Sequence, residues 1–479
     1  MTHITIIGGG IAGLATAFYL QQQSHDAGAP IDYTLIERRP RFGGKITTDY
    51  EDGFVIEGGP DSFITQKPWG MQLCRDLGIA DRIIPTNDHR RNVYVLKKGK
   101  LRAFPGGFRL AIPTEFVPFA LTTLISPWGK LRMGMDLFIP PRQEQSDESL
   151  ANFFRRRLGN EAVDTIAGPM MGGIYTADPE QLSIQSTFPM FVEMERKYGS
   201  LIKAMQAGKK RRAAAHPPGQ NNSKPPAMFT SLQGGMNELI ETLVSRLEGD
   251  LRPGCSVARV EYQSPGFKIY FDDPDTPPLA TDAVVLAVPA FVAAALVGKM
   301  APALAEKLNR IRYVSTANIS LAYRYSDVLP HHDLNGFGFM IPKSENRSIL
   351  ACTWTSTKFN YRVPEDGALI RVFVGGDGRE HLLDLPDEEL VSMARAELAE
   401  IMGLAAEPMT HRVFRWRKGN PQYDVGHLDR VSEMESLAGQ FPGLYLTGSA
   451  FRGIGIPDCV KSAMNTVEQV LASTEKIYD

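Results

Sequence analysis

Three glycines near the N-terminus have the spacing of a dinucleotide-binding loop. Gly8, Gly10 and Gly13 form a G-x-G-x-x-G sequence between an expected strand and an expected helix. The first glycine permits a tight turn, the second lets a pyrophosphate approach the backbone, and the third lets helix and strand pack closely. The phosphates would lie at the helix N-terminus, where free N–H groups and the helix dipole favour anions.

The residues that follow indicate which dinucleotide this is. Glu37 ends the second expected strand, where an acid can accept hydrogen bonds from ribose hydroxyls. Arg38, Gly43-Gly44 and Lys45 come soon after it and add phosphate-binding elements. Gly58-Gly59-Pro60 offers another close backbone approach, which we place near a flavin ring. Each glycine pair alone could be a plain turn, but together they favour an extended FAD over NAD.

The C-terminal part of the chain is expected to return to the cofactor. A strand ends at Tyr445–Gly448, and Gly453–Pro457 opens the last helix. The N-terminus of that helix can stabilise negative charge on the pyrimidine end of a reduced flavin. The alternative is a helix start without a ligand.

Hydrophobic periodicity indicates the elements that must position these residues. Ile4–Ile7, Ile11–Gln22 and Tyr33–Glu37 read as strand, helix and strand, a βαβ unit that opens a doubly wound sheet. Further helices are predicted at Pro68–Leu77, Glu148–Leu158, Gly234–Arg246, Asp387–Met402 and Pro457–Leu471. Further strands are predicted at Ser256–Tyr262, Phe267–Phe271, Ala283–Val288, Asn318–Tyr325, Ile349–Thr353, Leu369–Val374 and Leu444–Thr447. The fold class is therefore α/β, with a Rossmann-like FAD-binding fold.

The same pattern suggests how the chain is divided. FAD-binding segments are expected at 1–60, 229–299 and 411–479, a helical and substrate-binding insertion at 61–205, a flexible loop at 206–228, and a substrate-binding sheet at 300–410. The loop prediction comes from Ala207–Ala227, which combines the basic cluster Lys209–Arg212 with several prolines. A solvated loop is favoured over a site for anionic lipid or a partner.

Composition excludes several classes of protein. Hydrophobic residues make up 43% and charged residues 22%, and the net charge of −2 does not favour a nucleic acid partner. The four cysteines and nine histidines lack metal-ligand spacing, so we expect no metal, reduced thiols and a cytoplasmic location. No apolar run is long enough to span a membrane. Leu110–Trp128, broken by prolines, reads as a channel wall, or as a surface that touches the membrane without crossing it.

Segments spread over nearly the whole chain resemble the oxygen-dependent porphyrinogen oxidases, above all the soluble bacterial enzymes that act on coproporphyrinogen III or protoporphyrinogen IX. These segments are Ile6–Leu14, Arg41–Lys45, Glu57–Phe63, Ser183–Pro189, Cys352–Thr355, Pro421–His427 and Gly453–Cys459. Amine oxidases and carotene desaturases share the glycine fingerprint. The more specific parts are Gly58–Phe63, Gly172–Tyr175, Pro421–Tyr423 with Gly426-His427, and Gly455–Asp458.

The resemblance implies a site as well as a fold, which would be an FAD domain of the amine oxidase and porphyrinogen oxidase type with a substrate-binding domain and an inserted helical domain. The FAD contacts would be Gly8, Gly10, Ile11, Ala12, Gly13, Glu37, Arg38, Gly44, Lys45, Gly59, Pro60, Asp61, Ser62, Val257, Trp416, Ile454, Gly455 and Ile456. Around the substrate the resemblance suggests Lys67, Ile174 and the segment near Trp354, and the apolar faces of the macrocycle are expected to rest on residues such as Ile174, Phe339 and Trp354. The alternatives are a solvated surface lysine at Lys67 and plain core positions for the three apolar residues.

The activity that the resemblance implies is removal of six electrons from coproporphyrinogen III in haem biosynthesis, giving coproporphyrin III, with O2 as acceptor and H2O2 as product. The flavin carries this chemistry, so we name no catalytic side chain, and His427 is as well explained by a structural role. The alternatives are a protoporphyrinogen IX oxidase, an FAD amine oxidase or carotenoid desaturase, and a non-catalytic tetrapyrrole carrier. Peripheral membrane contact and transient contact with neighbouring haem-pathway enzymes stay open.

Overall fold

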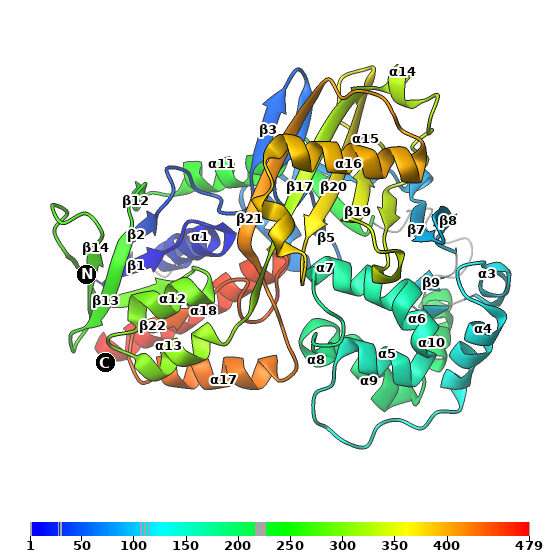
Figure 1. Cartoon of the computed structure of the whole chain (residues 1–479). Helices are drawn as coiled ribbons and strands as arrows, with labels where there is room; N and C mark the ends of the chain where they lie inside the picture. The colour runs from blue at the N-terminus through cyan, green and yellow to red at the C-terminus, as the bar shows by residue number, and fades with distance from the viewer. Residues whose placement is uncertain are drawn as a thin grey trace.

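The computed structural model describes residues 2–26, 28, 31–105, 108–109, 112–113, 115–215 and 227–478. A parallel sheet with helices on both faces occupies the end of the molecule where the two termini lie (Figure 1). A second, larger sheet and a group of helices make up the other end. This arrangement confirms the predicted α/β class.

The parallel sheet draws its strands from three distant stretches of the chain. Its order is β12 (Asp250–Pro253), β2 (Asp32–Glu37), β1 (His3–Ile7), β16 (Ala283–Leu286) and β22 (Leu444–Leu446). All neighbouring strands in it are parallel. Parallel sheets bury both faces, which explains why the strand sequences are almost continuously apolar.

Helices cover the two faces of this sheet. One face packs against α1 (Ile11–Asp26), α2 (Pro68–Asp76), α11 (Asn237–Arg246) and α18 (Ile456–Tyr478). The other packs against α12 (Ala290–Val297), α13 (Pro302–Asn309), α17 (His427–Ala438) and a small sheet of β13 (Val257–Tyr262), β14 (Phe267–Phe271) and β15 (Leu279–Thr281). Ile6 and Ile7 belong to opposite clusters, as the strand alternation requires.

In the part of the chain that the structure describes, the large sheet contains seven strands. Its order is β21 (Thr410–Pro421), β17 (Tyr313–Arg324), β20 (Gly367–Gly375), β19 (Ile349–Trp354), β18 (Gly338–Met340), β7 (Val93–Lys97) and β8 (Lys100–Ala103). Helix α16 (Asp387–Met402) packs on one face. The edge strands β7 and β8 come from the part of the chain where mainly helices were expected.

The helical group has its own core. It includes α3 (Phe116–Leu121), α4 (Pro127–Gly134), α5 (Leu150–Leu158), a π-helical segment at Val163–Gly172, α9 (Pro189–Tyr198) and α10 (Leu201–Ala215). The flexible loop predicted from Ala207 is wrong in its first part, because α10 continues to Ala215. Alanine, lysine and arginine are strong helix formers, and Leu201 and Met205 anchor the helix in the core. Residues 216–226 of that predicted loop lie outside the described residues.

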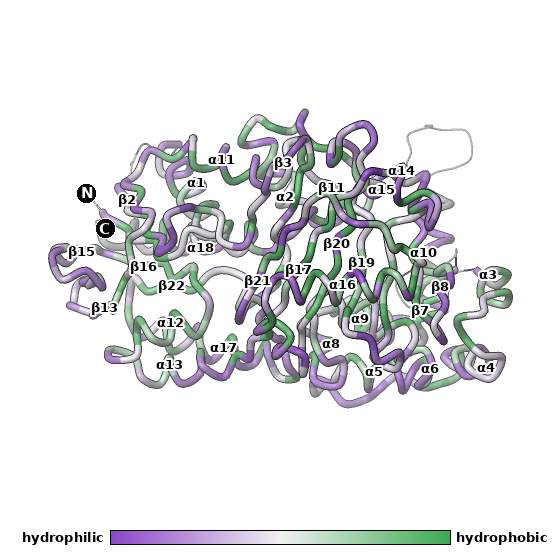
Figure 2. Tube along the Cα trace, turned by 45° about the horizontal axis from the view of Figure 1, so that its top comes forward, coloured by the Kyte–Doolittle hydropathy of each residue, from purple (hydrophilic) through white to green (hydrophobic). Residues whose placement is uncertain are grey.

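Figure 2 shows how apolar segments run through the strands of both sheets and the helices against them, while polar segments follow the periphery. None of the described helices is long and apolar enough to cross a membrane. Within the described ranges, His, Cys, Asp and Glu side chains also form no cluster of three that could hold a metal ion.

Candidate cofactor and substrate site

The glycine loop between β1 and α1 fits its predicted use. Gly8 has φ +111°, and a Cβ there would lie 2.5 Å from the carbonyl oxygen of Ala287. A Cβ on Gly13 would lie 1.8 Å from the carbonyl oxygen of Gly8, so that the helix packs directly on the loop. Gly10 differs, because its Cβ would meet nothing within 4 Å. The space in front of Gly10, beside the free N–H groups that begin α1, suits a pyrophosphate.

Glu37 at the end of β2 lies against the same loop. Its Oε2 accepts from the backbone N–H of Gly9 at 2.8 Å, and its Oε1 accepts from the N–H of Arg39 at 2.9 Å. The carboxylate is thereby held beside the glycine loop, where a ribose would lie. Val257, the predicted adenine contact, begins β13 two residues after Cys255, whose N–H donates to the Glu37 carbonyl at 3.0 Å.

Arginines next to Glu37 organise the second glycine pair. The Arg39 guanidinium donates to the Gly44 carbonyl at 3.2 Å and lies 5.7 Å from the Trp416 ring. Arg41 donates to the same carbonyl at 3.0 Å. Arg38, the arginine expected at the cofactor, is exposed and makes no ion pair among the described residues. Arg39 and Arg41 therefore shape this loop, although sequence reasoning did not single them out.

Lys45 is a cation without a carboxylate partner among the described residues. Its Nζ donates to the Gly419 carbonyl at 2.6 Å, which joins the second glycine loop to β21. Burial lowers the pKa of Lys45. A partly buried ammonium paired only with a carbonyl can stabilise an anionic ligand such as a phosphate or a reduced flavin.

The loop at residues 57–62 is fixed by side chains of the large sheet. The Gly58 carbonyl accepts from Asn318 Nδ2 at 2.6 Å and from Trp416 Nε1 at 2.7 Å, and the Gly59 carbonyl accepts from Arg371 Nη2. A Cβ on Gly59 would lie 1.8 Å from the Lys45 carbonyl oxygen, so this turn requires glycine.

Several polar groups at this loop have no partner. Among the described residues, the backbone N–H groups of Gly59, Asp61 and Ser62 have no hydrogen-bond acceptor. The buried atoms Asn318 Oδ1 and Arg371 Nε likewise lack partners there. Buried polar groups are normally satisfied, so Asn318 Oδ1 and Arg371 Nε point to a ligand here, and the three open N–H groups add donors along its edge. An isoalloxazine ring has both donors and acceptors along its edge.

Charges around Asp61 keep it ionised. Although burial alone would raise the pKa of Asp61, the cations of Lys358 and Arg371 hold it below its usual range. Lys358 pairs with Asp61 Oδ2 at 2.8 Å, and Ser62 donates to Asp61 Oδ1 at 2.7 Å. The turn is therefore cross-linked to α15 (Thr355–Lys358) and cannot easily change shape.

The C-terminal segment also reaches the site. Ile454 and Gly455 precede α18, which begins at Ile456 and so presents its N-terminus there. The loop before it is held by Tyr423, whose hydroxyl accepts from the Gly453 N–H at 2.7 Å and donates to the Ser449 carbonyl at 2.8 Å. His427 is fully buried, and its Nε2 donates to the Phe451 carbonyl at 2.7 Å. This contact gives His427 a structural role.

Side chains alternate between the two faces of the large sheet, and this decides which of them face the loop at residues 57–62, called the flavin loop below. On β20, Ile370, Val372 and Val374 pack under α16. Arg371 and Phe373 therefore point to the other face. On β19, Trp354 packs under α16, which leaves Thr353 on the other face. The face turned to the flavin loop is thus the one that carries Asn318, Arg371 and Phe373.

Two predicted substrate residues lie on the opposite face. Phe339 and Trp354 are 1% and 0% exposed, inside the core beneath α16. They have no surface to offer a substrate in this structure. Their neighbours in sequence, Met340 and Thr353, are partly exposed on the flavin-loop face. An offset of one residue along each strand therefore moves the side chain from one face of the sheet to the other.

The other two predicted substrate residues are accessible. Ile174 is 54% exposed, at the end of the helical group. Lys67 immediately precedes α2 and makes an ion pair with Asp458 on α18. Lys67 therefore lies where the segment that follows the flavin loop meets the last helix, α18.

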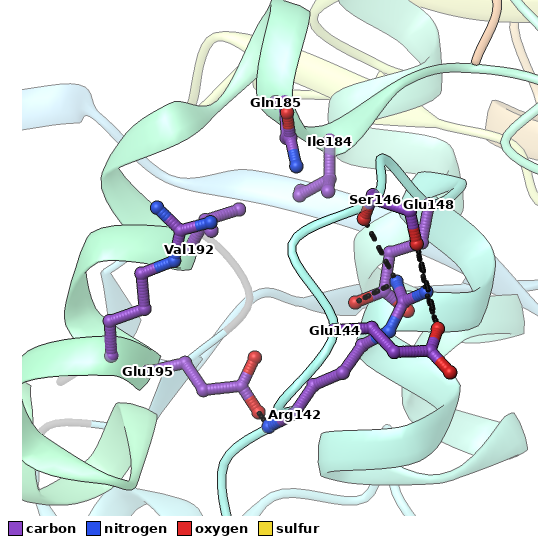
Figure 3. A pocket seen from close by; sticks show the side chains of 9 residues that line it. Arg142, Glu144, Ser146, Glu148, Ile184, Gln185, Val192 and Glu195 are labelled. Atoms are coloured by element: carbon purple, nitrogen blue, oxygen red, sulfur yellow. Dashed lines mark hydrogen bonds and ion pairs between the residues drawn. The ribbon is translucent and has the colours of Figure 1, made fainter. Parts of the chain in front are cut away.

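A charged depression on the helical group is a less suitable site. It lies between residues 142–148 and α8 (Ile184–Thr187) with α9 (Figure 3). Arg142 pairs there with Glu144 at 2.7 Å and with Glu148 at 3.5 Å. Glu195 is held by Arg156 and Arg157. These ion pairs leave Arg196 as the only lining cation without a carboxylate partner among the described residues, which is too little to hold a dinucleotide.

Comparisons with known proteins agree with this geometry. A family profile described as "Flavin containing amine oxidoreductase" matches residues 11–471. The chain is 36% identical to the coproporphyrinogen III oxidase of Bacillus subtilis, over 98% of each chain. It is 37% identical to that of Staphylococcus aureus, over 98% of this chain and 99% of the relative. It is 29% identical to the chloroplastic protoporphyrinogen oxidase 1 of Arabidopsis thaliana, over 98% of this chain and 88% of the relative.

Solved structures give the same result. The crystal structure of a protein described as a protoporphyrinogen oxidase from Exiguobacterium superimposes with a TM-score of 0.85 at 32% identity, over 99% of each chain. Wild-type putrescine oxidase with bound putrescine has a TM-score of 0.67 at 16% identity and covers 98% of this chain and 99% of its own, which shows a shared fold.

Proposed function

The chain belongs to the flavin-containing amine oxidoreductases and, within them, to the porphyrinogen oxidases, and on that premise we propose that it oxidises coproporphyrinogen III to coproporphyrin III. FAD is its cofactor, O2 the electron acceptor and H2O2 the product. The relatives that share 36–37% identity carry the name of the coproporphyrinogen III enzyme. The plant protoporphyrinogen oxidases, at 27–29%, support protoporphyrinogen IX as the second substrate to test.

One observation carries the proposal. Three side chains of the large sheet donate hydrogen bonds to the carbonyls of Gly58 and Gly59. The loop that would carry the flavin ring therefore lies directly on the sheet face that bears Phe373. Along that face, Phe373, Ala351 and Met340 follow one another across β20, β19 and β18. All three are partly exposed, and Thr353 lies two residues after Ala351 on the same face of β19.

We assign this row as the platform for the macrocycle. A tetrapyrrole has broad apolar faces, which suit Phe373, Ala351 and Met340, and ionised propionates at its rim, which need cations. Lys67 is the cation that we assign to a propionate. Ile174 is assigned to the opposite side of the substrate, because it is the exposed apolar residue of Gly172–Tyr175, a segment that resembles the porphyrinogen oxidases.

FAD would be held by the loop at Gly8–Gly13, Glu37, Gly44, Lys45, the turn at Gly59–Ser62, Val257, Trp416 and Ile454–Ile456. When bound it supplies the two-electron acceptor that each of the three oxidation steps needs. The protein orients the ring through Asn318 and Arg371, and Lys45 with the N-terminus of α18 provides positive potential. We assign no general base, since His427 is buried and bonded to Phe451.

The test is a rate comparison. Purified protein is incubated in air with coproporphyrinogen III and, separately, with protoporphyrinogen IX, and red porphyrin fluorescence and H2O2 are followed together. The proposal expects both signals, with the higher kcat/KM for coproporphyrinogen III. Porphyrin binding without H2O2 would indicate a carrier, and activity only towards an amine would indicate an amine oxidase.

We also propose that the protein, in the cytoplasm, touches a membrane surface through α3, α4 and the turn after them. Leu121, Trp128, Leu131 and Phe138 there are 76%, 80%, 62% and 84% exposed. These helices form the end of the molecule away from the termini (Figure 1). Exposed aromatic and aliphatic side chains next to cations such as Lys130 suit a lipid interface.

The base of the apolar patch formed by Leu121, Trp128, Leu131 and Phe138 is held by buried polar contacts. Asp136 and Arg157 form an ion pair in which both side chains are 0% exposed, and Ser200 donates to Asp136 at 2.6 Å. Co-sedimentation with anionic phospholipid vesicles tests the contact: the wild type should sediment, and Leu131→Asp/Phe138→Asp should not. If neither sediments, the patch is free for the transient contact with neighbouring haem-pathway enzymes that the sequence left open.

A further inference from the structure

Lys67 is engaged by a carboxylate of the protein itself. Its Nζ lies 2.6 Å from Oδ1 and 2.7 Å from Oδ2 of Asp458, so both oxygens accept from the same ammonium. Lys67 immediately precedes α2, and Asp458 lies in the first turn of α18. The pair therefore bridges the two segments that flank the flavin site in our proposal.

The two partners differ in freedom. The Asp458 side chain is 14% exposed, and it packs on the backbone before α18, where a Cβ on Gly453 would lie 2.5 Å from Asp458 Cγ. Lys67 is 45% exposed and makes no other hydrogen bond or ion pair among the described residues. Asp458 is thus a fixed carboxylate, and Lys67 is a long side chain that can move away from it.

The charges around the pair leave Asp458 as the competitor for Lys67. The charged or titratable groups near it in the described part of the chain are Lys45, Tyr175, Tyr423 and Cys459, none of which is an anion at neutral pH, so Asp458 carries the only negative charge of this group. Lys461, on the same helix as Asp458, instead lies 4.4 Å from the Trp69 ring. An ion pair that is this exposed adds little net stability, so replacing one carboxylate by another costs little.

We propose that Asp458 occupies the place on Lys67 that a carboxylate of the substrate takes, and so sets the affinity for carboxylate-bearing tetrapyrroles. This inference rests on the proposed function, because it assumes that Lys67 meets the substrate. While Lys67 is paired, the pair is neutral and attracts a propionate weakly. When the propionate displaces Asp458, Lys67 turns to the ligand and Asp458 stays in place in the dipole of α18, which favours an anion there.

The test measures binding without turnover. Coproporphyrin III, the fully oxidised product, cannot donate electrons further, so its dissociation constant can be measured by fluorescence on the FAD-loaded protein. Asp458→Asn should bind it about fivefold more tightly at low ionic strength, and added salt should reduce this gain. Flavin absorbance of each variant shows that the cofactor site is intact.

Glu433→Gln is the matched control, because it neutralises a carboxylate paired with Lys307 on the surface of α13 and α17. It should leave the dissociation constant unchanged. If Asp458→Asn binds coproporphyrin III with unchanged affinity, Asp458 does not compete. If it binds more weakly, Asp458 positions Lys67 instead, and that outcome also overturns the inference.

A second variant covers the case in which Asp458→Asn does not fold. Lys67→Arg keeps the charge, but a guanidinium grips Asp458 with two parallel hydrogen bonds. Competition therefore predicts weaker binding of coproporphyrin III, by several fold, whereas equal or tighter binding contradicts it. A wild type that oxidises neither porphyrinogen would refute the proposed function. Normal oxidation with unaltered binding in both variants would refute this inference alone.

Discussion

The rings of Tyr423 and His427 are stacked, with centroids 3.9 Å apart and an interplanar angle of 13°. Both side chains are fully buried. Their polar atoms bond to Ser449, Phe451 and Gly453, in the loop that leads into α18. These contacts couple the position of the Pro421–His427 segment to the position of the N-terminus of α18, which we place at the flavin.

Tyr423→Phe should keep the stack and lose both hydrogen bonds of the hydroxyl. The Gly453 N–H and the Ser449 carbonyl would be left unpaired, which should lower the free energy of unfolding by about 1–3 kcal/mol. The dissociation constant of FAD should rise, measured by reconstitution of the apoprotein. Tyr445→Phe, which loses only a bond to Ser473, is the control. Equal FAD affinity in wild type and Tyr423→Phe would show that the loop does not depend on this hydroxyl.

His427 should make stability depend on acid pH. Burial lowers the pKa of His427 to about 4 from the ordinary value of 6.5. The unfolded chain therefore takes up a proton first as pH falls, and stability present above pH 6.5 is lost progressively down to about pH 4. The loss amounts to about 3 kcal/mol. His427→Gln should lack this contribution, whereas His411→Gln, at an exposed position of β21, should keep it. Parallel pH profiles for wild type and His427→Gln would contradict the prediction.

Gly10→Ala and Gly13→Ala should separate cofactor binding from folding. A methyl group on Gly10 meets no protein atom, so the apoprotein should keep its Tm within about 2 °C, while the pyrophosphate is blocked and FAD binding is lost. A methyl group on Gly13 meets the Gly8 carbonyl at 1.8 Å and should destabilise the apoprotein by several kcal/mol. Thermal unfolding and flavin titration measure the two effects. Normal FAD affinity in Gly10→Ala would place the phosphates elsewhere.

The two faces of the large sheet should respond differently to substitution. Thr353→Trp fills the proposed platform and should raise KM at least about tenfold with unchanged flavin content. Trp354→Phe opens space in the core beneath α16 and should cost about 1–3 kcal/mol of stability with KM within about twofold of wild type. Steady-state kinetics and denaturant unfolding check both. The reverse pattern would return the substrate to the side of Trp354.

The local parts of the site could be predicted from the sequence. Gly8, Gly10, Gly13 and Glu37 act within one βαβ unit, whose strands and helix were placed correctly, and each glycine has a distinct local reason. The apolar periodicity also located β19, β20 and α16 within one or two residues. Where a residue acts through its own backbone or its own element, the sequence is sufficient.

The non-local parts could not be predicted. Asn318 and Arg371 hold carbonyls that lie 260 and 312 positions away in the chain. No local pattern distinguishes them from other polar residues in strands. Phe339 and Trp354 were predicted as apolar contacts of the macrocycle, yet only the packing of α16 decides which face of a strand is buried. Ala207–Ala215 was predicted as a loop because a neighbouring proline-rich stretch outweighed good helix formers.

If the protein is a porphyrinogen oxidase, electrons must pass from a porphyrinogen to a flavin bound between these loops. The direct test is to mix the FAD-loaded protein with coproporphyrinogen III in the absence of oxygen and follow the flavin absorbance. We predict that the yellow colour bleaches as coproporphyrin fluorescence appears, and that air restores the colour with release of H2O2. A protein that carries no flavin and takes up none, or a bound flavin that stays oxidised, would contradict it.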